Sequence, residues 1–111
     1  MPQPLSVNEA LDNVAQIAGL DVSVSGVLAC EHESVALYHH PKAEIRGEYE
    51  SSIWLYADGG SLRFDRQTRE SLNGKRVIVS GTLLGPDKRF GGCGHMGLWT
   101  AEILVKTMER N

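Results

Sequence analysis

The chain has 111 residues, a net charge of −3 at pH 7 and an apolar fraction of 41%, values typical of one ordinary globular domain. No run approaches the ~18 apolar residues that a membrane span needs, and Met1–Ser6 lacks the basic and apolar stretches of a secretion signal. We therefore expect a single cytoplasmic domain over 1–111 with no membrane partner. The acidic balance counts against broad affinity for nucleic acid, because proteins that grip phosphate backbones usually carry a basic excess.

The N-terminal segment 6–18 predicts an amphipathic helix. Ser6 and Glu9 have the spacing of a capping box, in which each side chain satisfies the backbone N–H of the other residue. Apolar residues then recur at helical spacing on one face, and Gly19 provides the stop. The apolar positions are Val7, Ala10, Leu11, Val14, Ile17 and Ala18.

Five later segments predict β-strands from their β-branched, aromatic and alternating apolar residues. A short helix is expected between the third and fourth strands, from Asp65 to Leu72, with Asn73–Gly74 as a left-handed terminator. The predicted strands are 21–29, 35–39, 53–56, 76–84 and 99–105.

The first and fourth strands share the pattern V-x-V-S-G-x-L, at Val22–Leu28 and Val77–Leu83. Both place a glycine, Gly26 or Gly81, in the inward-facing row. Glycine inside a strand marks a bulge or a sharp bend, as barrel corners require. Two bent strands at matching places indicate a closed barrel rather than an open sheet.

The order of strand, strand, strand, short helix, strand, strand resembles the OB-fold, a five-stranded Greek-key barrel, over residues 20–107. We therefore predict a mainly β fold of this kind, preceded by the N-terminal helix. The chain also resembles small bacterial proteins with G-H-M-G-[LIV]-[WF] before a last strand, here Gly94–Trp99. In those proteins a V-x-V-x-G-T-[LF] strand comes first, here Val77–Leu83. Both resemblances imply a fold, and neither implies an activity.

The third strand offers a stacking platform. If Ile53 and Leu55 face the core, Trp54 and Tyr56 face outward, and Tyr38 can join them from the second strand. Resemblance to OB-folds implies that bases stack on this face. Lys42 and Arg46, with Arg63 and Arg66, would supply positive charge nearby. The alternatives are that Trp54 and Tyr56 pack beneath the N-terminal helix or form a dimer interface.

Two Cys-x-His pairs form a second candidate site, for metal. Cys30 and His32 follow the first strand, and Cys93 and His95 precede the last one. Resemblance to OB-folds implies that these two loops border one cleft, where a Cys₂His₂ set would suit Zn²⁺. The alternative is two small buried thiols and two unrelated histidines, because reduced cysteine often behaves as a small apolar residue.

The glycine-rich stretch Gly91–Trp99 raises a third candidate, His95 itself. Its flanking glycines leave backbone amides unshielded, which suits an anion, and an imidazole can titrate near neutrality. The alternative is structural: the His95 ring braces the loop while Met96 and Trp99 fill the mouth of the barrel. Of the neighbouring pair His39 and His40, one should face the core and the other the solvent.

No nucleophile elbow, phosphate-binding loop or paired-carboxylate spacing is present, so we expect no enzyme. The sequence favours a non-enzymatic OB-fold binding module for single-stranded nucleic acid or a short oligomer, with no cofactor. A zinc-binding or protein-interaction domain that uses the Cys-x-His loops, with a protein partner or a second copy of the chain, is the alternative.

Overall fold

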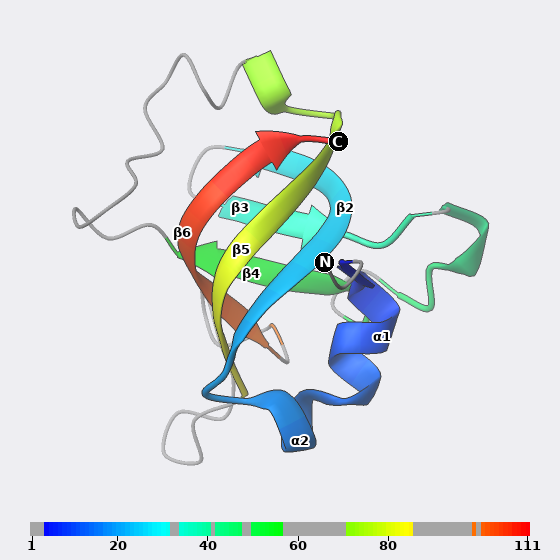
Figure 1. The fold of residues 1–111 in the computed structure, drawn as a ribbon. Helices are drawn as coiled ribbons and strands as arrows, with labels where there is room; N and C mark the ends of the chain where they lie inside the picture. The colour runs from blue at the N-terminus through cyan, green and yellow to red at the C-terminus, as the bar shows by residue number, and fades with distance from the viewer. Residues whose placement is uncertain are drawn as a thin grey trace.

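The computed structural model describes residues 4–31, 34–40, 42–47, 50–56, 71–85, 99 and 101–111. These residues form a mainly β structure with two short α-helices and one 3₁₀ turn (Figure 1). The elements in chain order are β1 (Leu5–Ser6), α1 (Val7–Asp12), α2 (Val14–Ile17), β2 (Asp21–Glu31), β3 (Ser34–Tyr38), η1 (Lys42–Glu44), β4 (Ser52–Tyr56), β5 (Arg76–Leu84) and β6 (Glu102–Arg110). None of the helices in these described ranges is long and apolar enough to cross a membrane.

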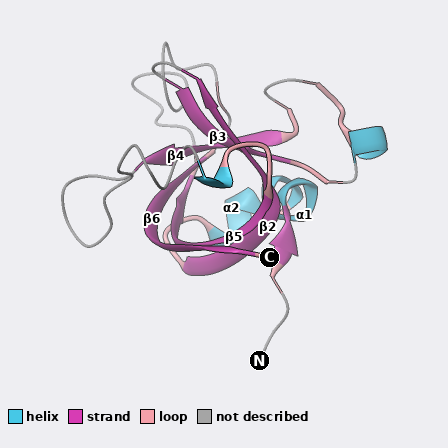
Figure 2. Ribbon diagram, turned by 90° about the horizontal axis from the view of Figure 1, so that it is seen from above, coloured by secondary structure: helices cyan, strands magenta, loops and turns pink. Residues whose placement is uncertain are grey.

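The sheet closes on itself. β2 pairs antiparallel with both β3 and β5, and β3 pairs antiparallel with β4. β6 closes the sheet, because it pairs in parallel with β4 on one side and antiparallel with β5 on the other. Figure 2 shows the resulting barrel from above, and Figure 1 shows α1 and α2 at its lower right, next to the start of β2. Five strands close the barrel, and the two-residue strand β1 is added in parallel to β2. The predicted five-stranded OB-like barrel is therefore confirmed.

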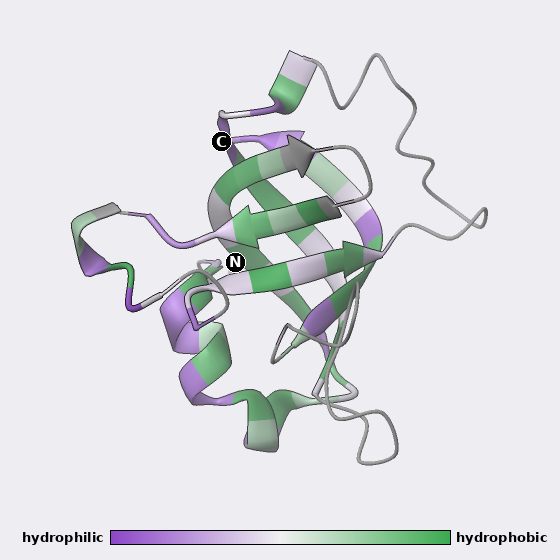
Figure 3. Ribbon diagram, turned by 180° about the vertical axis from the view of Figure 1, so that it is seen from behind, coloured by the Kyte–Doolittle hydropathy of each residue, from purple (hydrophilic) through white to green (hydrophobic). Residues whose placement is uncertain are grey.

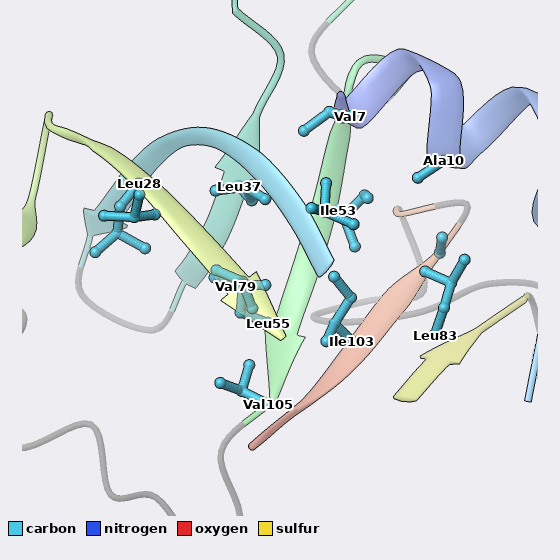
Figure 4. Packing of buried hydrophobic residues seen from close by; sticks show 13 residues of the cluster. Val7, Ala10, Leu28, Leu37, Ile53, Leu55, Val79, Leu83, Ile103 and Val105 are labelled. Atoms are coloured by element: carbon cyan, nitrogen blue, oxygen red, sulfur yellow. The ribbon is translucent and has the colours of Figure 1, made fainter. Parts of the chain in front are cut away.

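The core lies inside this barrel and under α1. Alternate residues of every long strand point inward, and α1 adds Val7 and Ala10 from the open end beside Ile53 (Figure 4). Each fully buried aliphatic side chain contributes about 1.5–3 kcal/mol to stability. The buried cluster consists of Val7, Ala10, Val24, Leu28, Leu37, Ile53, Leu55, Val77, Val79, Leu83, Ala101, Ile103 and Val105.

The two repeated glycines lie where the barrel bends. β2 changes partner at Val27, which pairs with Tyr38 on β3 and with Arg76 on β5. A Cβ on the adjacent Gly26 would lie 2.5 Å from the carbonyl oxygen of Tyr38. A Cβ on Gly81 would overlap a backbone carbonyl oxygen of β6, at the register shift between β5 and β6. The predicted bends are therefore confirmed, and both positions lack room for a side chain.

The N-terminal helix differs from the prediction, because it breaks at Asn13. The capping box of Ser6 and Glu9 is present in α1. The side-chain amide of Asn13 donates to the carbonyl of Glu9 at 2.8 Å, and φ of −112° takes Asn13 out of helical geometry. Asparagine competes for backbone groups in this way, so helical periodicity alone does not reveal the break.

The last strand, two glycines and the second predicted helix also bear on the prediction. The last strand runs from Glu102 to Arg110 rather than from 99 to 105. Its final residues are mostly polar, yet they pair with β5 through the backbone, which the alternation of apolar residues cannot show. Gly19 and Gly74 have φ of +88° and +81°, as expected for helix terminators. Of the predicted helix 65–72, only residues 71–72 lie in the described part, and they are helical.

Candidate ligand-binding face

The outer face of β3 and β4 carries the aromatic residues that the sequence indicated. Ile53 and Leu55 are buried in the core, so Trp54 and Tyr56 project from the other side of β4. Figure 3 shows the two strands side by side from behind; hydrophobic and less hydrophobic residues alternate along β4, whereas β3 is hydrophobic over most of its length. Tyr38 shares this face, because the cross-strand partner of Trp54 is Ala36, two residues before Tyr38. We call this surface the aromatic face.

Trp99 covers one part of the aromatic face. Its ring lies 4.8 Å from that of Trp54, centroid to centroid, with the two planes tilted by 56°. Tilted aromatic pairs at this separation are favourable beyond their buried area. Trp99 and Ala36 are both buried here, with Tyr38 and Trp54 packed against them. The expectation that Trp99 fills the mouth of the barrel is wrong, because Trp99 precedes β6 and the inward alternation of that strand does not extend to it.

The opposite part of the face is open to solvent. Tyr56 is 46% exposed, and its cross-strand neighbour on β6, Leu104, is 37% exposed. The carboxylate-bearing Glu102 lies opposite Trp54 on the same strand pair. Leu104 was not singled out in the sequence. The signal was present in the last strand, where Leu104 lies between the inward residues Ile103 and Val105 and so had to face outward.

The basic residues expected near this face have a different role where they are described. Both terminal nitrogens of Arg46 donate to the carboxylate of Asp12 on α1, at 2.7 and 3.0 Å. The hydrogen bond from Arg46 lowers the pKa of Asp12, and the same contact raises the pKa of Arg46. This pair ties the segment after η1 to α1. The backbone of Lys42 lies in η1, its side chain is outside the described atoms, and Arg63 and Arg66 lie outside the described residues.

His39 is buried and His40 is exposed, as the pair predicted. The backbone N–H of Asn8 donates to Nδ1 of His39 at 3.2 Å. Nε2 of His39 therefore carries the proton, and it donates to the carboxylate of Glu44 at 2.9 Å. Because both ring nitrogens are engaged, this histidine fastens α1 and η1 to the end of β3.

The metal prediction falls mainly outside the described residues. His32, Cys93 and His95 are not described, and neither is the side chain of Cys30. The backbone of Cys30 lies within β2, where it pairs with Val35, and not in the loop that was expected to follow the strand. Among the residues that are described, no group of three or more histidine, cysteine, aspartate or glutamate side chains could hold a metal ion. The zinc site and the role of His95 therefore remain predictions.

A second surface lies across β2, β5 and β6. A groove of about 530 Å³ opens there between Asp21, Ser23 and Lys106. Asp21 accepts hydrogen bonds from Lys106 and Thr82, both at 2.8 Å, and these bonds lower its pKa. The Ser23 hydroxyl pairs with that of Ser80 at 2.8 Å. These groups satisfy one another, so we do not take this groove as the ligand site.

Comparison with known proteins supports the fold. No family model and no curated protein matches the chain. Asparaginyl-tRNA synthetase from Pyrococcus horikoshii superposes on 99% of this chain with a TM-score of 0.54 and 16% identity, and the chain spans 22% of the synthetase. OBody AM2EP06, bound to hen egg-white lysozyme, matches 99% of this chain and 96% of its own, with a TM-score of 0.57 and 12% identity. A DUF3299 family protein from Pseudomonas aeruginosa matches 99% and 85% of the two chains, with a TM-score of 0.53 and 11% identity.

Proposed function

We propose that the chain is an OB-fold binding module that holds single-stranded nucleic acid on its aromatic face. The observation that carries the proposal is the row of Tyr38, Trp54 and Tyr56 on the outer side of β3 and β4, open to solvent at Tyr56. Bases stack on such side chains without regard to sequence, with about 1–3 kcal/mol per base. One structural neighbour is asparaginyl-tRNA synthetase, whose substrate is a nucleic acid, and this supports nucleic acid as the ligand class.

Electrostatics set the expected mode of binding. Arg46, the expected cation whose side chain is described, is paired with Asp12, and Glu102 adds a negative charge beside Trp54. Phosphate contacts should therefore be few, and stacking should supply most of the affinity. Because the dependence of affinity on salt scales with the number of phosphates neutralised, we expect a shallow but measurable slope.

The proposal is for binding rather than catalysis. The buried histidine, His39, is a poor general base, because its Nδ1 accepts the backbone N–H of Asn8 and its Nε2 donates to Glu44. A general base needs a free nitrogen within reach of the substrate proton. His39 instead reads as a structural residue that fastens the end of β3.

Fluorescence anisotropy with a labelled single-stranded DNA of about ten nucleotides tests the proposal. We expect Tyr56→Ala to weaken binding about tenfold, the lower half of the range for one stacked base. Leu20→Ala is the matched control, because Leu20 is 55% exposed and lies before β2, away from the aromatic face. No binding by the wild type, or equal affinity of the two variants, would refute the proposal.

A protein partner is the second candidate, and Leu104 is the observation that favours it. Leu104 extends the exposed surface of Tyr56 with an aliphatic side chain, which offers no ring for stacking. The similar OBody AM2EP06 is bound to a protein, lysozyme. Leu104→Ser separates the two candidates: it should leave the affinity for DNA within about twofold if bases stack on Tyr56. A large loss of DNA affinity in Leu104→Ser would contradict the stacking mode.

A further inference from the structure

A pocket of about 350 Å³ opens beside the aromatic face, at the end of β3. Tyr38 and His40 line it from β3 and the residues that follow, Val27 and Ala29 from β2, and Ile45 from the segment after η1. Its volume lies within the range of about 300–1,000 Å³ that is usual for small-ligand sites. We call it the Tyr38 pocket.

The Tyr38 pocket is continuous with the aromatic face. Val27 is the cross-strand partner of Tyr38, so the two side chains share the outer side of the sheet. Tyr38 also packs against the cluster of Ala36 and Trp99 that borders Trp54. A ligand that crosses the strands from β4 to β2 therefore passes Trp54 and Tyr38 and arrives at the pocket.

The walls of the pocket suit one flat, mainly apolar group. Val27, Ala29 and Ile45 offer aliphatic surface, and Tyr38 offers an aromatic ring. Gly74 also lines the pocket, and a Cβ there would meet no atom within 4 Å, so this side is open. His40 also lines the pocket and is exposed, so its imidazole offers a polar group to the polar edge of a base or to a phosphate.

We infer that the Tyr38 pocket holds one unstacked nucleobase of the strand that lies on the aromatic face. The inference rests on the proposed function and deepens it, because it assigns a site for a single base next to the stacking row. Because the pocket suits a single ring system, we also expect a mononucleotide to bind there without the rest of the strand.

Two-dimensional NMR of the ¹⁵N-labelled full chain with adenosine 5′-monophosphate tests the inference. We expect the backbone amides of His40 and Gly74 to shift on titration. Ala29→Leu places a larger side chain in the pocket and should abolish these shifts, and it should weaken binding of the ten-nucleotide DNA about tenfold. Ala15→Leu is the matched control, because it makes the same change at an exposed position of α2.

The outcomes separate the two proposals. If the DNA binds the aromatic face but the mononucleotide shifts neither pocket amide, the pocket inference fails and the proposed function stands. Equal shifts in Ala29→Leu and Ala15→Leu would also overturn the pocket as the site. If the mononucleotide binds the pocket and the DNA does not bind, the inference that a strand places its base there fails together with the proposed function. If Ala29→Leu changes the amide spectrum as a whole, the substitution has disturbed the fold. Ile45→Phe is then the variant to use, because it fills the pocket from the irregular segment after η1 and not from a strand.

Discussion

Gly26, in β2 where the strand changes partner, should tolerate no side chain. In Gly26→Ala the new Cβ would lie 2.5 Å from the carbonyl oxygen of Tyr38, 2.8 Å from Cγ of Leu37 and 3.0 Å from Cγ2 of Val7. The nearest of these atoms belongs to the backbone and cannot rotate away. Overpacking of this kind costs about 1–3 kcal/mol, and we expect the upper end of that range. The lower entropy of the unfolded alanine chain offsets about 0.4–1 kcal/mol of it.

Gly19 provides the contrast, because its constraint is conformational rather than steric. Its φ is +88° and a Cβ there would meet no atom within 4 Å. Gly19→Ala should therefore cost only about 1–2 kcal/mol of left-handed strain, and Gly19→Asn less, since asparagine tolerates that conformation. At Gly26 the order should reverse, with asparagine worse than alanine because it is larger. Urea unfolding followed by tryptophan fluorescence measures all four variants, and the reasoning is refuted if Gly26→Ala stays within about 0.5 kcal/mol of the wild type.

Three further outcomes test other contacts. Asp12→Asn removes the ion pair with Arg46. That pair lowers the pKa of Asp12 below its usual 3.8. The wild type therefore has the stability contributed by the pair at pH values above 3.8 and loses it as the pH falls. Urea midpoints should therefore decline less steeply from about pH 6 to about pH 3 in the variant than in the wild type. His39→Leu leaves the buried N–H of Asn8 without its acceptor and should cost about 1–3 kcal/mol in urea unfolding, whereas His40→Leu at the exposed neighbour should change stability by under about 0.5 kcal/mol. A structural zinc held by Cys30, His32, Cys93 and His95 predicts that excess chelator lowers the Tm, and an unchanged Tm would contradict the zinc site.

The sequence predicted the barrel because its inward rows repeat strictly. β5 was predicted with its observed bounds, since Val77, Val79 and Leu83 alternate with outward residues on both sides of Gly81. The outward placement of Trp54 followed from the same rule. Alternation fixes which side of a strand a residue faces, so both the core and the aromatic face could be inferred from it.

The features that the sequence did not predict depend on contacts between distant segments. The bidentate pair of Arg46 with Asp12 joins residues 34 positions apart. Asp12 lies in the predicted helix, but Arg46 lies in no periodic pattern that would place it. The short strand β1 exists because Leu5 lies beside Val24 once the chain has folded back. Charge and local pattern suggested Arg46 as a ligand residue, but only the packing of α1 shows that its guanidinium already has a partner.

The contact of Trp54 with Trp99 joins the aromatic residues of β4 to the glycine-rich stretch before β6. Trp54 belongs to β4, and Trp99 is the last residue of the glycine-rich stretch Gly91–Trp99 that precedes β6. Because the two rings lie 4.8 Å apart, a change at Trp99 alters the surface presented by Trp54 and uncovers the buried Ala36. Trp99 is only 5% exposed, so it acts on a ligand through the placement of the Trp54 ring. The aromatic face is formed by β3 and β4, by the adjoining strand β6, and by Trp99, which lies outside these strands. The pattern of the strands alone therefore does not predict its shape.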